Sequence, residues 1–145
     1  MSLFRLQNRI VALGVVVALG GLPSSMHAQG KQGIVIVYLD PMTTAGVGGT
    51  VNLAPNGPAT NFEVTLNPGE SSQEEGAYKV RVVQGSCSAP GRVVQDLDEV
   101  PADGKARKED GNLRLSDVRR GDHVIQVAAR RRNEVVACGL IPAAR

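Results

Sequence analysis

Residues 76–87 read Gly-Ala-Tyr-Lys-Val-Arg-Val-Val-Gln-Gly-Ser-Cys, and this stretch decides the fold. From Tyr78 to Val82 every second side chain is large and apolar. This two-residue period is typical of a strand with one buried face. The stretch ends at Cys87, and the second cysteine of the sequence is Cys138, close to the C-terminus. The pattern therefore predicts a central strand that leads directly to one of only two cysteines.

The first segment predicts export. Arg5 and Arg9 give a positive start, and residues 10–22 form an apolar run without charge. This order, followed by small residues, is typical of a secretory signal peptide. A membrane anchor is the alternative, but the run is shorter than the ~20 apolar residues that a spanning helix needs. We therefore expect cleavage, with no transmembrane anchor afterwards.

Cleavage is expected after Ala28 or after Gly30, so that residues 1–28 are the signal peptide and residues 31–145 form one domain. The exported protein would then be periplasmic or secreted. Two cysteines in an oxidising compartment predict one disulfide.

Charge and aromatic content argue against nucleic acid as a partner. The sequence holds 16 Lys and Arg against 14 Asp and Glu, and Arg5 and Arg9 belong to the segment expected to be removed. The remaining chain is therefore close to neutral, and it contains no tryptophan. Nucleic-acid binding usually needs a basic surface and stacking rings.

Short apolar runs between glycines and prolines predict seven strands besides the central one. They cover residues 33–39, 50–53, 61–66, 91–94, 113–115, 123–129 and 134–140. Residues 101–110 are highly charged and contain Gly104, which predicts a solvated loop and strand edge rather than a helix. Residues 116–120 are expected to connect two strands, with Val118 inward. This spacing predicts an all-β fold, either a β-sandwich or a flattened barrel.

Two motifs resemble a known family. Residues 85–94 read Gly-Ser-Cys-Ser-Ala-Pro-Gly-Arg-Val-Val, and residues 137–141 read Ala-Cys-Gly-Leu-Ile. They are similar to the copper/zinc superoxide dismutase fold, and most of all to the short superoxide dismutase-like and chordin-type (CHRD) domains of exported bacterial proteins. The resemblance implies an eight-stranded Greek-key β-sandwich with a disulfide between Cys87 and Cys138.

The metal ligands of the catalytic members have no counterpart here. Their paired histidines match Arg81 and Val83, a later histidine matches Ala128, and the guiding arginine matches Val135, although Arg132 is near. Copper and zinc sites need several nitrogen or sulfur ligands. We therefore expect no metal and no other cofactor.

One histidine, His123, remains after the expected cleavage, and it starts a predicted strand on the side that faces the core. A single imidazole at a strand start suggests neither a metal site nor a catalytic triad. A dimer in which two copies of His123 share a metal is left open.

Three further features have ordinary explanations. Asp96, Asp98, Glu99 and Asp103 could offer oxygen ligands to calcium, but their spacing favours a solvated cluster. The tripeptide 120–122, Arg-Gly-Asp, matches an adhesion motif and is also common turn chemistry. The arginines at 119–120 and 130–132 flank one predicted strand, so we expect them at opposite ends of it.

These observations lead to two hypotheses of function. The first is a non-catalytic, exported interaction or envelope-associated module with an unidentified protein or envelope partner. Lys79 and Arg81, on the outward side of the central strand, are its candidate surface. The alternative, which follows from the resemblance alone, is a copper/zinc superoxide dismutase-family protein in superoxide metabolism or copper handling.

Overall fold

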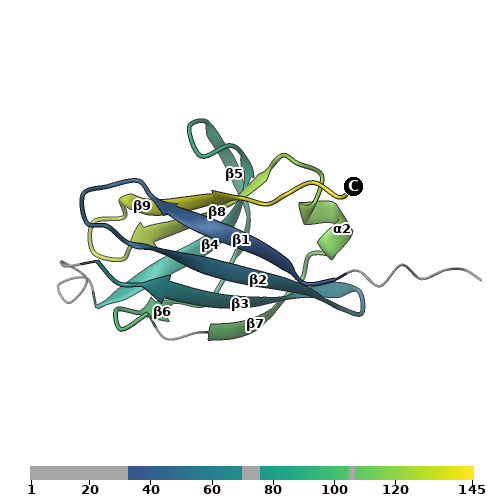
Figure 1. Cartoon of the computed structure of the whole chain (residues 1–145), viewed down its shortest axis with the longest axis horizontal. Helices are drawn as coiled ribbons and strands as arrows, with labels where there is room; N and C mark the ends of the chain where they lie inside the picture. Colours follow the sequence, from purple (N-terminus) through teal and green to yellow (C-terminus); the bar gives the residue numbers. More distant parts are fainter. Residues whose placement is uncertain (1–32, 70–75, 105–106) are drawn as a thin grey trace, which may run out of the picture. The chain divides into compact units, whose positions relative to one another are not determined.

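The computed structural model describes residues 33–69, 76–104 and 107–145, whose strands form one antiparallel sheet curled around a hydrophobic core (Figure 1). These residues belong to one compact unit, Lys31–Arg145. In chain order its elements are β1 (Val35–Pro41), β2 (Gly48–Asn56), β3 (Ala59–Asn67), β4 (Ala77–Gly85), β5 (Pro90–Asp96), β6 (Val100–Pro101), β7 (Arg107–Gly111), α2 (Leu115–Val118), β8 (His123–Ala129) and β9 (Val135–Leu140).

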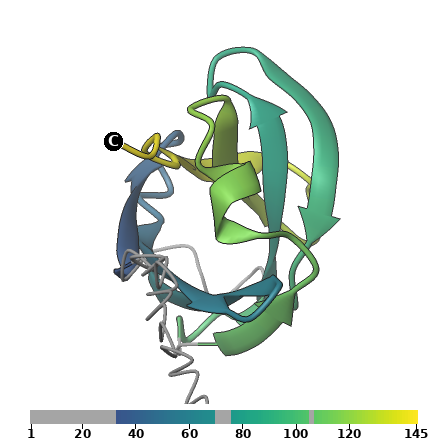
Figure 2. The ribbon, with the colours of Figure 1, turned by 90° about the vertical axis from the view of Figure 1, so that its right-hand side faces the viewer.

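The strands follow the order β5-β4-β8-β9-β1-β2-β3-β7, and β6 pairs with β4 beside this path. Figure 2 shows the sheet curling round so that α2 lies across one end of the enclosed space. The two outermost strands approach each other at that end. The backbone N–H of Asn112, just after β7, donates a hydrogen bond of 3.1 Å to Oε1 of Gln95 in β5. A side chain thus bridges the gap between the two outermost strands.

The central strand behaves as its alternation predicts. Tyr78, Val80 and Val82 of β4 are buried in the main core. Val80 lies opposite Val127 of β8, and Val82 lies opposite Ile125. Because facing residues of neighbouring strands share a side of the sheet, β4 and β8 together form one wall of the core.

The mostly β character, the antiparallel pairing and the disulfide between Cys87 and Cys138 are confirmed. The strand predicted for residues 123–129 has those bounds in the structure. The main strand order contains eight strands, which is the predicted number, and the two-residue β6 beside it is the ninth among the described residues.

The strand predicted for residues 113–115 does not form. Leu113 precedes the short helix α2, and Leu115 begins it. Leu115 and Val118 are both buried, at the three-residue spacing that places two side chains on one side of a helical turn. Leu113 also packs against the core, so both leucines are apolar for the same reason. Their two-residue spacing therefore looks like that of a strand. Val118 lies inward, as predicted.

The charged segment contains more pairing than expected. Residues 107–111 form β7, which confirms the predicted strand edge, and Val100–Pro101 form β6, which was not predicted. In β7, Arg107 lies opposite Val64 of β3, and Gly111 lies opposite Thr60. Backbone pairing on an outermost strand needs no apolar alternation, so the sequence gives little signal there.

The predicted signal peptide and its cleavage sites lie outside the described residues. Among the residues that are described, no helix is both long and apolar enough to cross a membrane.

Candidate functional site

The positions matched to metal ligands lie together on the outer side of β4 and β8. Arg81 lies opposite Gln126, and the same register places Val83 and Ala128 on that side of the sheet. We call this surface the β4 outer face; it comprises Lys79, Arg81, Val83, Val124, Gln126 and Ala128. The structure therefore brings the three matched positions onto one face.

None of these three positions offers a metal ligand. Val83 and Ala128 are buried and have no donor atom. Arg81 is a permanent cation, and its Nε is buried without a hydrogen-bond partner among the described residues. The two residues of the predicted candidate surface differ in exposure: Lys79 is exposed, and Arg81 is half-buried.

The disulfide covers part of the β4 outer face. Cys138 of β9 lies opposite Gln126, and its bond to Cys87 holds the turn after β4 against the sheet. Val83, Val124 and Cys138 form a second, smaller apolar cluster, with Cys87 packed against it. Both sulfur atoms take part in this bond, so neither is a free thiol that could bind a metal ion. Here the two cysteines have a structural role.

His123 lies at the other end of the β4–β8 pair from Tyr78. It starts β8 opposite Gln84, and only 9% of its surface is exposed. Its Nδ1 is 2.8 Å from Oδ1 of Asp122. No hydrogen bond of good geometry reaches this nitrogen from the described residues. We therefore treat the contact with Asp122 as a close electrostatic one rather than a directed hydrogen bond.

A chain of polar contacts connects His123 to β5. Nε2 of Gln84 donates to Oδ2 of Asp122 at 3.2 Å, and Nε of Arg92 donates to Oε1 of Gln84 at 3.3 Å. The hydrogen bond from Gln84, followed by the nearby His123, holds the pKa of Asp122 below its ordinary value of 3.8. Asp122 is thus kept ionised beside the buried imidazole.

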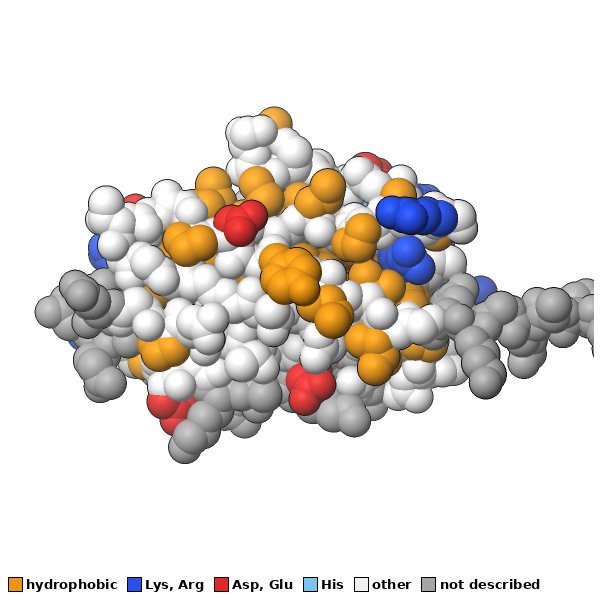
Figure 3. Space-filling model, viewed as in Figure 1, with side chains coloured by type: hydrophobic (Ala, Val, Ile, Leu, Met, Phe, Trp, Pro, Cys, Tyr) orange, Lys and Arg blue, Asp and Glu red, His pale blue; other side chains and the backbone are white. Residues whose placement is uncertain are grey.

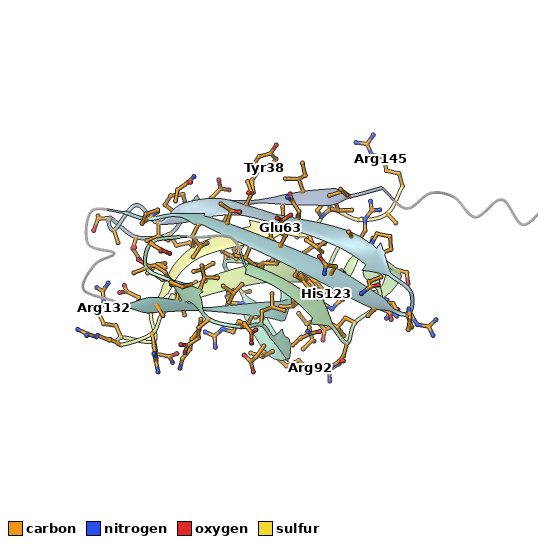
Figure 4. All side chains as sticks on the ribbon, turned by 90° about the horizontal axis from the view of Figure 1, so that it is seen from below. Tyr38, Glu63, Arg92, His123, Arg132 and Arg145 are labelled. Carbon is orange, nitrogen blue, oxygen red and sulfur yellow. A yellow bond between two sulfur atoms is a disulfide. The ribbon has the colours of Figure 1, made fainter. Side chains whose placement is uncertain are left out.

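These residues line a cavity of about 390 Å³ between β5 and the α2 connection. We call it the α2 cavity. Figure 4 labels His123 and Arg92, which come from β8 and β5 at this end of the sheet. Its lining consists of Gln84, Arg92, Val93, Val94, Leu113, Asp117, Val118, Arg120, Asp122 and His123. Such a lining can hold a small molecule that is partly apolar and partly charged.

Sequence reasoning named His123 but missed the cavity. Gln84, Arg92 and Leu113 come from three separate segments, and no spacing in the sequence connects them. The Arg-Gly-Asp tripeptide at 120–122 matches an adhesion motif in the sequence. In the structure Arg120 pairs with Asp117 at 2.9 Å, whereas Asp122 contacts Gln84 and His123. Its two charged ends thus take part in separate local contacts.

The other predicted candidates are dispersed. Glu99 pairs with Arg130 at 3.3 Å, and Asp96 and Asp98 are exposed. Across the ranges that the structure describes, no three or more His, Cys, Asp or Glu side chains are placed to hold a metal ion. The two arginine clusters lie at opposite ends of β8, as predicted, and Figure 4 shows Arg132 at the far end from His123.

A second surface was not predicted at all. Val35, Val37 and Leu39 of β1 are buried, so the side chains between them face outward. We call this surface the β1 outer face; it comprises Ile34, Ile36 and Tyr38, which are 68%, 48% and 69% exposed, and Leu140 of β9, which is 57% exposed. Figure 3 shows apolar side chains along the face that carries β1, and Figure 4 shows Tyr38 projecting away from the sheet.

Comparison of the chain with protein-family models, with curated proteins and with solved structures finds no match.

Proposed function

We propose that the protein is an exported, non-catalytic interaction module whose β1 outer face contacts a protein partner in the cell envelope. The row of exposed apolar side chains on that face carries this proposal. Contiguous apolar surface is uncommon on soluble domains, and where it occurs it often marks an interaction site. Tyrosine is also among the residues enriched in interfaces, and Tyr38 lies within the row.

The fold that we propose for the module is a Greek-key β-sandwich of the superoxide dismutase-like type. The strand order supports it. β7 lies beside β3, and Gln95 of β5 bridges to Asn112 just after β7. When β5 and β7 are counted as neighbours through this hydrogen bond, the order β3-β7-β5-β4 corresponds to a Greek key, which supports the proposed fold. The disulfide between Cys87 and Cys138 agrees with the resemblance in the sequence.

The side chains of the β4 outer face favour the non-catalytic role. Dismutation on this fold would need several imidazoles at fixed positions around a redox-active copper ion. The matched positions hold Arg81, Val83 and Ala128, of which the last two lack any donor atom. His123 is on the core side of the sheet, away from these three positions.

A crosslinking experiment tests the contact surface. A photo-crosslinking amino acid is placed at position 36 on β1, and in a matched control at position 93 on β5, where the apolar Val93 is also exposed but lies at the far end of the strand order. In cells that produce the full chain, position 36 should give a crosslinked product of one defined mass, and position 93 should not. Adding Tyr38→Asp should abolish that product. Equal products from both positions would refute the proposed surface.

A metal analysis tests the non-catalytic role separately. The full chain, with its disulfide formed, is incubated with copper and zinc, dialysed and analysed for metal and for superoxide consumption. We expect far less than one metal ion per chain and no turnover, since the donor set is incomplete. About one ion per chain with rapid turnover that His123→Ala removes would instead establish the enzyme.

A further inference from the structure

The α2 cavity combines two kinds of wall. Val94, Leu113 and Val118 make part of it apolar, and Arg92 and His123 make another part polar. Small-molecule sites are commonly clefts of ~300–1,000 Å³, in which apolar walls bury the ligand and a few polar groups orient it. The volume of about 390 Å³ lies within this range. The cavity is therefore suited to a small ligand with both an apolar and a polar part.

The charges around the cavity are paired except at Arg92. Arg120 pairs with Asp117 at 2.9 Å, and Asp122 accepts a hydrogen bond from Gln84. The Nε of Arg92 donates to the neutral amide oxygen of Gln84, and in the part of the chain that the structure describes this guanidinium has no acidic partner. A cation at the cavity wall without an acidic partner favours an anionic ligand.

His123 adds a largely buried polar group to the wall. The residue is 9% exposed and lines the cavity. Its Nδ1 lies 2.8 Å from Oδ1 of Asp122, so a carboxylate already lies beside that nitrogen. The imidazole is therefore a buried neighbour of the cavity whose NMR signals can report a ligand there.

We propose that the α2 cavity binds a small amphipathic carboxylate. Its apolar body packs against Leu113 and Val118, and its carboxylate lies against the guanidinium of Arg92, with the imidazole of His123 in the nearby wall. The planar guanidinium of arginine offers donors in a fork that matches a carboxylate, and such charge-assisted hydrogen bonds are among the stronger ones. The site is separate from the β1 outer face, so the two proposals stand or fall independently.

Three probes separate the parts of this ligand: hexanoate has both parts, acetate lacks the apolar body and 1-hexanol lacks the charge. Each is titrated into the full chain carrying His27→Gln, in which His123 gives the only imidazole NMR signals. Hexanoate should shift these signals saturably with a dissociation constant of about 1 mM, an ordinary value for so small a ligand. The dissociation constants of acetate and 1-hexanol should be at least about tenfold higher than that of hexanoate.

Two exposed arginines provide the matched variants. Arg92→Gln should weaken hexanoate binding about tenfold, the loss expected for one charge-assisted contact, and Arg131→Gln, at the other end of β8, should leave it unchanged. Unchanged amide spectra of both variants without ligand establish that they fold. The proposal is overturned if hexanoate gives no saturable shift up to about 50 mM, if acetate or 1-hexanol binds as tightly, or if Arg92→Gln binds like the unsubstituted chain.

Discussion

The β4 outer face and the β1 outer face are two parts of one curled sheet, and they differ in how far their apolar side chains are buried. On the β4 outer face, Val83 and Val124 are buried beside the disulfide. On the β1 outer face, Ile36 and Tyr38 are exposed. Both faces carry apolar side chains, but only the first is covered by the protein's own chain.

The difference shows what a crosslink adds to a small sheet. The turn after β4 reaches Cys138 through Cys87, and this covalent connection closes a loop between residues 51 positions apart. It holds a covering segment over side chains that would otherwise face water. The β1 outer face has no such connection among the described residues, so its apolar side chains are available to another molecule.

The largest expected effect is the loss of that cover. Cys87→Ala combined with Cys138→Ala should lower the free energy of unfolding by about 2–5 kcal/mol, the usual cost of losing a native disulfide from a small secreted domain. Urea unfolding of the oxidised protein and the double variant measures the difference. Ser88→Ala, in the same exposed turn, is the control and should stay within about 0.5 kcal/mol. A double variant as stable as the oxidised protein would mean that the disulfide does not hold the β4 outer face together.

The second effect concerns the strand that joins the two faces. β9 lies between the strands of the two faces, Cys138 and Leu140 both lie on its outer side, and Gly139 lies between them. A β-carbon at Gly139 would overlap the backbone oxygen of Tyr38 and press on Val37. Gly139→Ala should therefore push β1 and β9 apart and destabilise the protein by about 1–3 kcal/mol, as overpacking usually does.

Gly33→Ala is the matched control, because no atom lies within 4 Å of a β-carbon built there. Thermal unfolding followed by circular dichroism compares the two variants. If Gly139→Ala unfolds at the same temperature as Gly33→Ala, the close approach of β1 to β9 is wrong.

The third effect compares the two faces directly. Val83→Ala removes two buried methyl groups and should cost about 1–2 kcal/mol, at ~0.8 kcal/mol for each buried carbon. Ile36→Ala removes a larger group from an exposed position and should change stability by no more than about 0.5 kcal/mol. Chemical unfolding of both variants under one condition tests this order. The reverse order would mean that the β1 outer face is the covered one.

These faces also show how far the sequence could predict the structure. The alternation of Tyr78, Val80 and Val82 identified the buried side of β4, because successive side chains of a strand point to opposite faces and the apolar ones lie on the face toward the core. The bounds of β8 were also predictable, since its apolar run stands between two groups of arginines. The disulfide was predictable because the sequence contains only two cysteines and the expected compartment is oxidising, and the resemblance to a known family implied the same pair, Cys87 and Cys138.

The exposed row on β1 could not be predicted in the same way. Residues 34–39 are apolar on both sides of the strand, so their pattern does not tell which side another segment covers. The α2 cavity was also beyond reach, because Gln84, Arg92 and His123 meet only through the pairing of three strands. The spacing of Leu113 and Leu115 favoured a strand, whereas tertiary packing selects a helical turn that buries Leu115 with Val118.

The smallest expected effect concerns Asp122, at the edge of the α2 cavity. Gln84 donates a hydrogen bond to Asp122 and is the main reason why the pKa of this carboxyl lies below its ordinary value of 3.8; the nearby His123 lowers it further. Because the folded-state pKa is lowered, ionised Asp122 stabilises the fold above the ordinary pKa. That contribution is lost as the pH falls through the folded-state pKa. Asp122 is exposed, so solvent screening keeps the effect small.

Asp122→Asn should therefore be slightly less stable than the unsubstituted protein at neutral pH, and the difference should vanish in strong acid, below the folded-state pKa. NMR titration of the Asp122 carboxyl gives a more direct measurement. Gln84→Ala should move its midpoint upward, toward the ordinary pKa, because the hydrogen bond that favours the ionised form is gone. Gln95→Ala removes a glutamine that bonds to Asn112 instead and should leave the midpoint in place. If Gln84→Ala leaves the midpoint unchanged, then His123 rather than Gln84 is what lowers the pKa of Asp122.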